Sequence, residues 1–159
     1  MGEVVSIHLV RQRDGATEAV DRVMALTNHG LDGDWRSRQN RAGQLTLIEA
    51  EVLEEVGRVL GYPVPSGASR RQIVVRGVKL NELIGQRVHI GAVRLFVETS
   101  CDPCSRMEKT IGAGAWVALE GRGGVRCHVL AEGEICIGDP LVEEPFQEEV
   151  LERAAAKGR

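Results

Sequence analysis

The sequence is poor in aromatic residues and carries no excess of positive charge. Phe, Trp and Tyr make up 3% of its 159 residues, and the formal net charge at pH 7 is −3. Binding of single-stranded bases uses aromatic side chains for stacking, and general binding to nucleic acid or to an anionic membrane surface uses a basic excess. We therefore expect no nucleic acid partner and no membrane partner, and a small molecule as the ligand.

Long apolar runs are also absent. No segment approaches the roughly 18 apolar residues of a membrane-spanning helix. Residues 1–6 do not show the basic segment and following apolar stretch of a secretion signal. This pattern predicts a cytoplasmic protein. In a reducing compartment, the 4 cysteines favour catalytic or metal-binding roles over a disulfide framework.

No internal repeat and no low-complexity linker divides the chain. A chain of 159 residues is long enough to bury one core without disulfides or a metal. We expect a single domain over residues 1–145 and a C-terminal helical extension over residues 146–159. In that extension the glutamates come first and the basic residues come last, which is the order that the helix dipole favours.

Short segments in which apolar and polar residues alternate dominate the domain. Strands are expected over residues 3–10, 19–26, 45–48, 73–75, 87–90, 93–97, 125–131, 134–137 and 141–142. Residues 19–26 also allow a helix, and the loop that follows them favours the strand. Helical segments are expected over residues 49–60, 79–84, 103–112 and 116–119. Hairpins are expected around Gly91 and across Glu132 and Gly133. The pattern is typical of a mostly β protein, an antiparallel β-barrel with a few decorating helices.

The densest chemistry lies in residues 99–107. Asp102 followed by Pro103 is typical of a helix start, which places Cys104 in the first turn. There the helix dipole, unpaired amide groups and the nearby Arg106 would stabilise a thiolate. A thiolate of that kind can attack an electrophile, carry sulfur or ligate a soft metal, whereas a cysteine chosen blindly is more often a packed core residue.

Arginines gather at two further places, after the loop over residues 27–34 and before the strand over residues 73–75. Because a guanidinium group fits phosphate with two hydrogen bonds, both groups are candidate anion sites. The alternative for each is a solvated surface. The arginines are Arg36, Arg38 and Arg41 in the first group, and Arg70 and Arg71 in the second.

Several of these segments, in this order, resemble the MOSC domain. This is the C-terminal domain of molybdenum-cofactor sulfurases, and it also occurs in small stand-alone bacterial proteins and in the mitochondrial amidoxime-reducing component. The resemblance covers roughly residues 3 to 143 and implies a β-barrel-like fold. The matching segments are residues 30–34 (GLDGD), 43–48 (GQLTLI) leading to Glu51, 70–77 (RRQIVVRG), 83–91 (LIGQRVHIG), 103–104 (PC) and 133–139 (GEICIGD).

The resemblance implies a cysteine that serves as a sulfur carrier or as a molybdenum ligand, and Cys104 matches that position. Members that reduce N-hydroxylated substrates hold a pterin molybdenum cofactor, molybdopterin, through this thiolate, and basic residues bind its phosphate. Arg71 is the best match for such a role, while Gln72 stands where many members carry Asn. Further candidates for cofactor binding are Arg36, Arg38, Arg41, Asp34 and Thr99.

Two functions remain open at this point. The first is a molybdenum-dependent oxidoreductase that acts on N-hydroxylated compounds, with an external redox partner because no flavin or iron–sulfur motif is present. The second is a sulfur carrier that holds a persulfide on Cys104 for delivery to a partner. Pyridoxal phosphate is not expected, because it belongs to the separate aminotransferase-like domain of the sulfurases.

The residues themselves allow further alternatives. A structural zinc site could use Cys101, Cys104, Cys127 and His128, although adjacent strand residues such as the last two point to opposite faces. The first two could instead form a thioredoxin-like dithiol, but the βαβ setting of that motif is missing. His29 could contribute to a site or be a hydrogen-bonded loop residue. Asp34 could orient an arginine, act as an acid or stabilise a turn.

Overall fold

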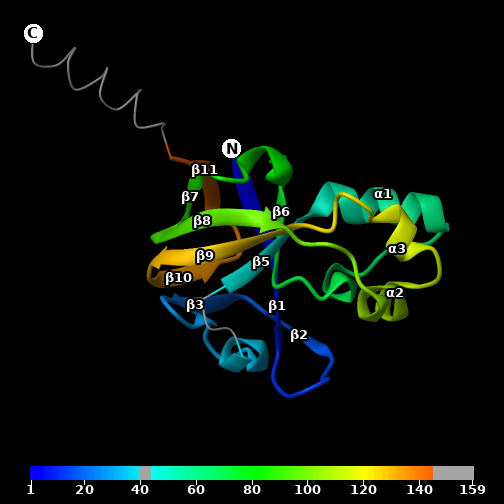
Figure 1. The fold of residues 1–159 in the computed structure, drawn as a ribbon, viewed down its shortest axis with the longest axis horizontal. Helices are drawn as coiled ribbons and strands as arrows, with labels where there is room; N and C mark the ends of the chain where they lie inside the picture. The colour runs from blue at the N-terminus through cyan, green and yellow to red at the C-terminus, as the bar shows by residue number, and fades with distance from the viewer. Residues whose placement is uncertain (40–43, 145–159) are drawn as a thin grey trace, which may run out of the picture.

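The computed structural model describes residues 1–39 and 44–144 (Figure 1). The C-terminal extension expected over residues 146–159 lies outside the described residues. Within the described ranges, no helix combines the length and the apolar character needed to cross a membrane. The elements are β1 (Gly2–Val10), β2 (Thr17–Val20), β3 (Arg22–Leu26), β4 (Gly30–Leu31), η1 (Trp35–Gln39), β5 (Gln44–Glu49), α1 (Ala50–Leu60), η2 (Ser66–Ser69), β6 (Ile73–Arg76), η3 (Leu80–Leu83), β7 (Arg87–Ile90), β8 (Val93–Ser100), α2 (Ser105–Ile111), α3 (Ala115–Ala118), β9 (Val125–Ala131), β10 (Gly133–Cys136) and β11 (Pro140–Glu143).

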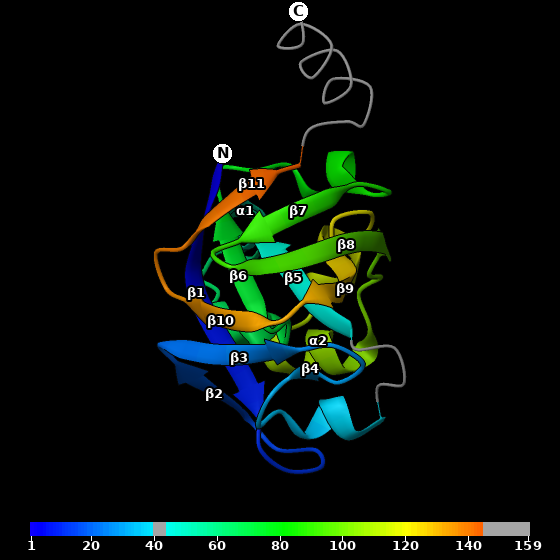
Figure 2. The same ribbon diagram turned by 90° about the vertical axis from the view of Figure 1, so that its left-hand side faces the viewer.

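Among the described residues, seven strands close into a barrel in the order β11, β7, β8, β9, β5, β6 and β1, because β11 also pairs with β1. The neighbouring pairs are antiparallel except β5 and β6. Those two parallel strands are joined by α1, as a parallel pair needs a crossover connection. β2 extends the sheet beside β1, and β3, β4 and β10 form a small second sheet (Figure 2). The expected mostly β barrel with a few decorating helices is confirmed.

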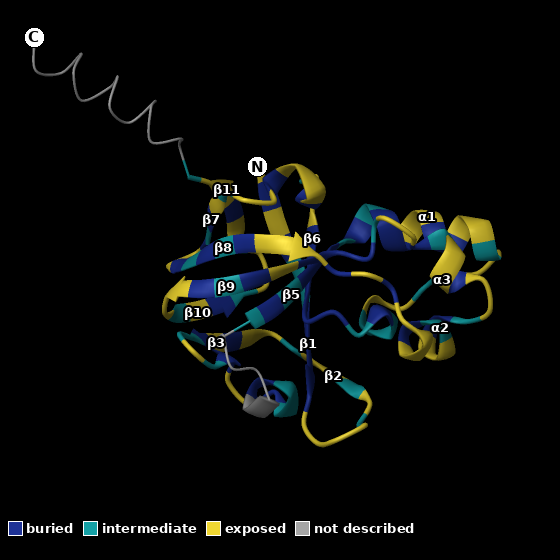
Figure 3. Ribbon diagram, viewed as in Figure 1, coloured by how far each residue is buried: buried dark blue, intermediate teal, exposed yellow. Residues whose placement is uncertain are grey.

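The core consists of two apolar clusters. One fills the barrel, where alternate residues of each strand point inward, as Val93, Leu95 and Val97 do on β8. The other lies between the barrel and the helices α1, α2 and α3, which gather on one side of it (Figures 1 and 3). The helix expected over residues 49–60 forms as α1 and buries Val52, Leu53 and Val56, whereas Val59, expected on the same apolar face, is exposed. Gly61 ends the helix in a left-handed conformation at φ 86°.

The single strand expected over residues 19–26 is wrong, because the chain forms β2 and β3 there. Val20 pairs with Ile7 of the barrel, whereas β3 pairs with β10 of the second sheet. The change of sheet occurs at Asp21, whose carbonyl accepts a hydrogen bond from the Ile137 amide at 3.0 Å. Asp21 and Arg22 are the two polar residues between apolar pairs in this segment, and this local pattern does not reveal that the chain changes sheet there.

The hairpin expected across residues 132–133 is also wrong. β9 already pairs with β5 on one edge and with β8 on the other, so no edge is left for β10. The Glu132 carboxylate accepts hydrogen bonds from the amide and hydroxyl of Thr27 at 3.0 and 2.7 Å. These bonds turn the chain toward β3, and Ile135 then pairs with Val23.

Candidate functional site

Cys104 lies between the end of β8 and the start of α2, on the connection that leads from the barrel to the helices (Figure 1). The expected helix start at Pro103 is wrong, because α2 begins at Ser105 and Cys104 is its N-cap residue, with extended backbone angles φ −136° and ψ 169°. The Cys104 side chain is exposed and makes no capping hydrogen bond. Its thiol is therefore accessible to a ligand or a reagent.

Arg71 holds the connection before Cys104 in its extended form. Its side chain is buried, and its guanidinium group donates to three backbone carbonyls: to Gly123 at 2.6 Å, Cys101 at 3.3 Å and Asp102 at 2.8 Å. These bonds, together with the bond from the Cys101 amide to the Gly124 carbonyl at 2.8 Å, keep residues 101–104 out of the helix. This explains why the Asp-Pro pair precedes α2 instead of starting it.

Other positive charges surround the same connection. We call Arg36, Arg70, Arg71, Arg106 and Arg126 the cationic cluster. Burial lowers the pKa of Arg71, the neighbouring thiol groups of Cys101 and Cys104 oppose this, and the like charges of Arg126 and Arg36 lower it further. Burial also lowers the pKa of Arg70, as do Arg36 and Arg106, while Cys104 and Asp14 act in the opposite direction. Arg70 and Arg71 thus lie close enough to Cys104 for their charges to stabilise an anion there.

The members of the cluster differ in how many of their N–H groups are already engaged. Within residues 1–39 and 44–144, the Arg70 side chain donates to the Gly15 carbonyl at 3.2 Å and the Arg126 side chain donates to the Cys101 sulfur at 3.7 Å, and neither side chain donates a further hydrogen bond. Both keep N–H groups for a ligand. Sequence reasoning missed Arg126, although its place beside the buried Cys127 on a strand indicates an outward direction.

Arg36, by contrast, is engaged by Asp34. Nε and Nη2 of Arg36 donate to Oδ1 and Oδ2 of this buried carboxylate at 3.0 and 2.8 Å, and Nη1 donates to the Arg70 carbonyl at 2.6 Å. Gln72 donates to Asp34 at 3.1 Å. Burial of Asp34 opposes its ionisation, but the hydrogen bonds and charge of Arg36 and the bond from Gln72 outweigh this and lower the pKa of the carboxyl group.

The remaining residues expected to bind a cofactor are more dispersed. The Gln72 side chain is buried, and its oxygen accepts from the Thr46 amide at 2.9 Å, so it ties strands together. Thr99 is exposed on β8 and pairs with Arg126. Arg38 belongs to η1. Arg41 lies outside the described residues.

A zinc site built on four clustered ligands does not fit the geometry. Cys127 is fully buried in the barrel core, and this burial raises the pKa of its thiol, whereas His128 faces Glu98 at 2.8 Å on the opposite side of β9. Among the described residues, no group of three or more His, Cys, Asp or Glu side chains is arranged to hold a metal ion. His29 instead lines a cavity of about 210 Å3, together with Trp35 and with other residues of the loop over residues 27–34.

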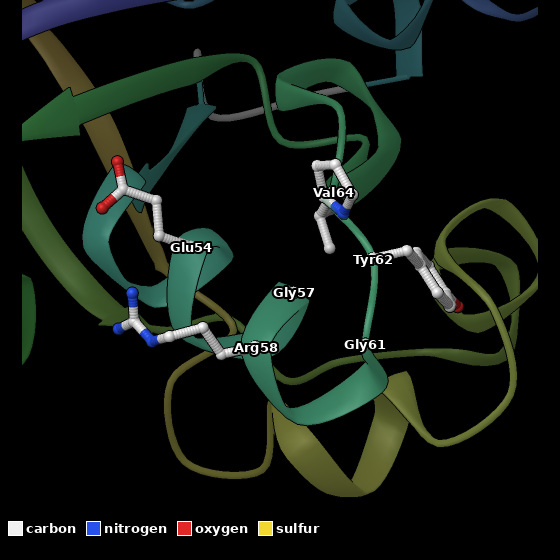
Figure 4. A pocket seen from close by; sticks show the side chains of 7 residues that line it. Glu54, Gly57, Arg58, Gly61, Tyr62 and Val64 are labelled. Carbon is white, nitrogen blue, oxygen red and sulfur yellow. The ribbon is translucent and has the colours of Figure 1, made fainter.

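A larger cavity lies away from Cys104. It has a volume of about 360 Å3 and opens between the C-terminal half of α1 and the chain that follows it (Figure 4). Tyr62 at its rim donates a hydrogen bond to the Ile111 carbonyl at 3.0 Å, which joins this loop to the end of α2. None of its lining residues was a candidate from the sequence. They are Glu54, Gly57, Arg58, Gly61, Tyr62, Pro63 and Val64.

Comparison with known proteins gives a family and a fold. The family model for the MOSC domain matches residues 27–142. The YuaD protein from Bacillus subtilis has a similar structure, with a TM-score of 0.76 at 17% identity, covering 92% of this chain and 98% of that one. YiiM from Geobacillus stearothermophilus has a TM-score of 0.69 at 18% identity, covering 91% and 76%. YiiM from Escherichia coli has a TM-score of 0.66 at 18% identity, covering 90% and 70%. No curated protein matches the chain.

Proposed function

Because the chain belongs to the MOSC family, we propose that it binds a molybdenum cofactor through the thiolate of Cys104. The observation that carries this proposal is an exposed thiol on a connection fixed by Arg71 and surrounded by guanidinium groups. A thiolate is a soft anionic ligand of the kind that such a metal accepts, and a phosphate group requires nearby cations. The residues present therefore fit both ends of a phosphorylated metal cofactor.

The residues around Cys104 would have different roles in binding the cofactor. Cys104 would ligate the metal, and Arg70 and Arg126 would bind the phosphate with their remaining N–H groups. Arg71 would act through the backbone, since its guanidinium group is engaged by carbonyls that set the direction of the Cys104 thiol. Arg36 would support Arg70 by donating a hydrogen bond to the Arg70 carbonyl. The bonds of Arg36 to Asp34 would keep its guanidinium group in place for this.

When bound, the cofactor would supply oxygen-atom transfer, which is the chemistry needed to reduce an N-hydroxylated compound. The protein would supply orientation and positive charge. A location in the cytoplasm and an external electron donor remain predictions of this proposal.

A sulfur carrier is the second candidate. It is favoured by the exposure of Cys104, because a persulfide carried for delivery must reach a partner's active site. Because Cys101 is buried, the connection over residues 101–104 has no accessible thiol besides that of Cys104. In this function the cationic cluster would stabilise the charge of the persulfide instead of holding a phosphate.

Elemental analysis tests the first candidate. Wild-type protein purified from a host that makes molybdenum cofactor is compared with Cys104→Ala and with Cys136→Ala, a matched control at a half-exposed cysteine on β10. We expect about one molybdenum and one pterin per chain in the wild type and the control, and loss of both in Cys104→Ala. Molybdenum absent from all three proteins, with labile sulfur on Cys104, would instead support the carrier.

A further inference from the structure

The loop between β1 and β2 reaches the candidate site from another part of the fold. Oδ1 of Asp14 accepts a hydrogen bond from Nη2 of Arg106 at 2.5 Å. The next residue, Gly15, accepts a bond at its carbonyl from Nη1 of Arg70 at 3.2 Å. One loop tip therefore contacts two members of the cationic cluster, and Arg106 lies two positions after Cys104.

Asp14 supplies negative charge where the cluster has an excess of positive charge. Arg36 and Arg106 lie close enough to Arg70 to lower the pKa of its guanidinium group further after burial has lowered it, and Asp14 partly offsets this. Asp14 also lies 3.9 Å from Arg13, an exposed residue of its own loop. The carboxylate thus neutralises part of the positive charge of Arg106 and Arg70, two cations of the kind that bind anionic ligands.

The loop tip is held in a specific conformation for this contact. Asp14 has a left-handed backbone at φ 55°, which is uncommon for a residue other than glycine, and the Gly15 amide closes the turn by donating to the Gln12 carbonyl at 3.0 Å. Arg70 is also left-handed, at φ 64°. Left-handed residues therefore stand on both sides of the contact between this loop tip and the cationic cluster. The exposure of the ion pair makes it weak enough to be exchanged.

We propose that Asp14 is an internal anion that closes the candidate site, and that an external oxyanion displaces it from Arg106 and takes its place in the cationic cluster. The ligand class is a phosphate or pyrophosphate group. The inference rests on the proposed function only in placing the binding site around Cys104, since it requires no metal.

The test uses the protein without cofactor and follows alkylation of Cys104 by peptide mass spectrometry. Iodoacetate is anionic and iodoacetamide is neutral, so the ratio of their rates at Cys104 reports how well the site attracts an anion. The variant is Asp14→Asn, because asparagine tolerates the left-handed backbone. The control is Asp21→Asn, which removes the same charge from an exposed position at the end of β2.

At low salt we expect Asp14→Asn to raise the iodoacetate to iodoacetamide ratio about 3-fold and to lower the inorganic pyrophosphate concentration that half-protects Cys104 by a similar factor. Asp21→Asn should leave both values unchanged. Arg106→Gln should do the opposite of Asp14→Asn, because it frees the loop tip but also removes a cation. If the loop tip were merely structural, both variants would change the ratio in the same direction.

Equal ratios in wild type and Asp14→Asn, or an equal rise in Asp21→Asn, would overturn the inference. This outcome is distinct from failure of the proposed function. A protein that never acquires molybdenum can still show displacement of Asp14 by pyrophosphate, and a protein that binds the cofactor can still show no effect of Asp14→Asn.

Discussion

Replacement of Arg71 by methionine tests whether this arginine organises the site through the backbone. Methionine fills a similar volume but cannot donate a hydrogen bond, so Arg71→Met leaves the carbonyls of Gly123, Cys101 and Asp102 without their donor. The connection over residues 101–104 should then lose its fixed extended form, and the Cys104 thiol its fixed direction. The expected result is a loss of stability together with a change in the reactivity of Cys104.

The magnitude follows from the geometry. The bonds to Gly123 at 2.6 Å and Asp102 at 2.8 Å are short, whereas the 3.3 Å bond to Cys101 shares Nη2 with the latter and adds little. Each short bond from a charged donor contributes about 1.5–3 kcal/mol. Removing a guanidinium group that is only 8% exposed recovers part of its desolvation cost. We therefore expect Arg71→Met to lower the free energy of unfolding by about 3 kcal/mol.

Urea unfolding followed by circular dichroism measures this free energy, because the unfolding free energy falls linearly with urea concentration. The control is Arg87→Met on an exposed residue of β7, which should change stability by less than about 0.5 kcal/mol. The rate of Cys104 alkylation by neutral iodoacetamide is recorded for the same proteins under native conditions. If Arg71→Met were as stable as the control and its Cys104 reacted at the wild-type rate, the assigned role of Arg71 would be refuted.

Two further predictions concern the surroundings of this connection. The folded-state pKa of Asp34 is lowered, so its carboxylate stabilises the fold above its unfolded pKa of about 4 and this contribution is lost as pH falls through the folded value. Thermal unfolding should therefore show a steeper loss of stability on acidification below about pH 4 in wild type than in Asp34→Asn, and parallel curves would contradict this. Gly123→Ala places a methyl group 2.3 Å from the Cys101 carbonyl oxygen, too close for either backbone to accept without moving. It should cost about 2 kcal/mol in urea unfolding. Gly2→Ala, whose methyl group would lie 3.0 Å from the Val78 side chain and 3.2 Å from the Arg76 carbonyl oxygen, should cost less than about 1 kcal/mol, and equal costs for the two variants would contradict this.

Local patterns in the sequence predicted much of the fold. Alternation located β1, β5, β7 and β9, and 3.6-residue periodicity located α1 and its end at Gly61, because these patterns depend on neighbouring residues alone. The same reasoning failed for β2, β3 and the partner of β10. Which strand pairs with which depends on the edges that the closed barrel leaves free, and local alternation carries no information about distant edges.

For the candidate site, too, the sequence predicted one part and the tertiary structure decided another. The sequence by itself predicted Cys104 as the central residue and arginines as its companions, because the Pro-Cys motif and the basic residues are visible as a pattern. Only the tertiary structure decided which arginines are engaged by the protein itself, as Arg71 is by carbonyls, and which keep N–H groups for a ligand, as Arg70 does. Only the structure brought Asp14 to the same place. The physical reason is that the number of N–H groups an arginine keeps for a ligand depends on which protein acceptors already bind the others. These acceptors come from segments that meet only when the barrel closes.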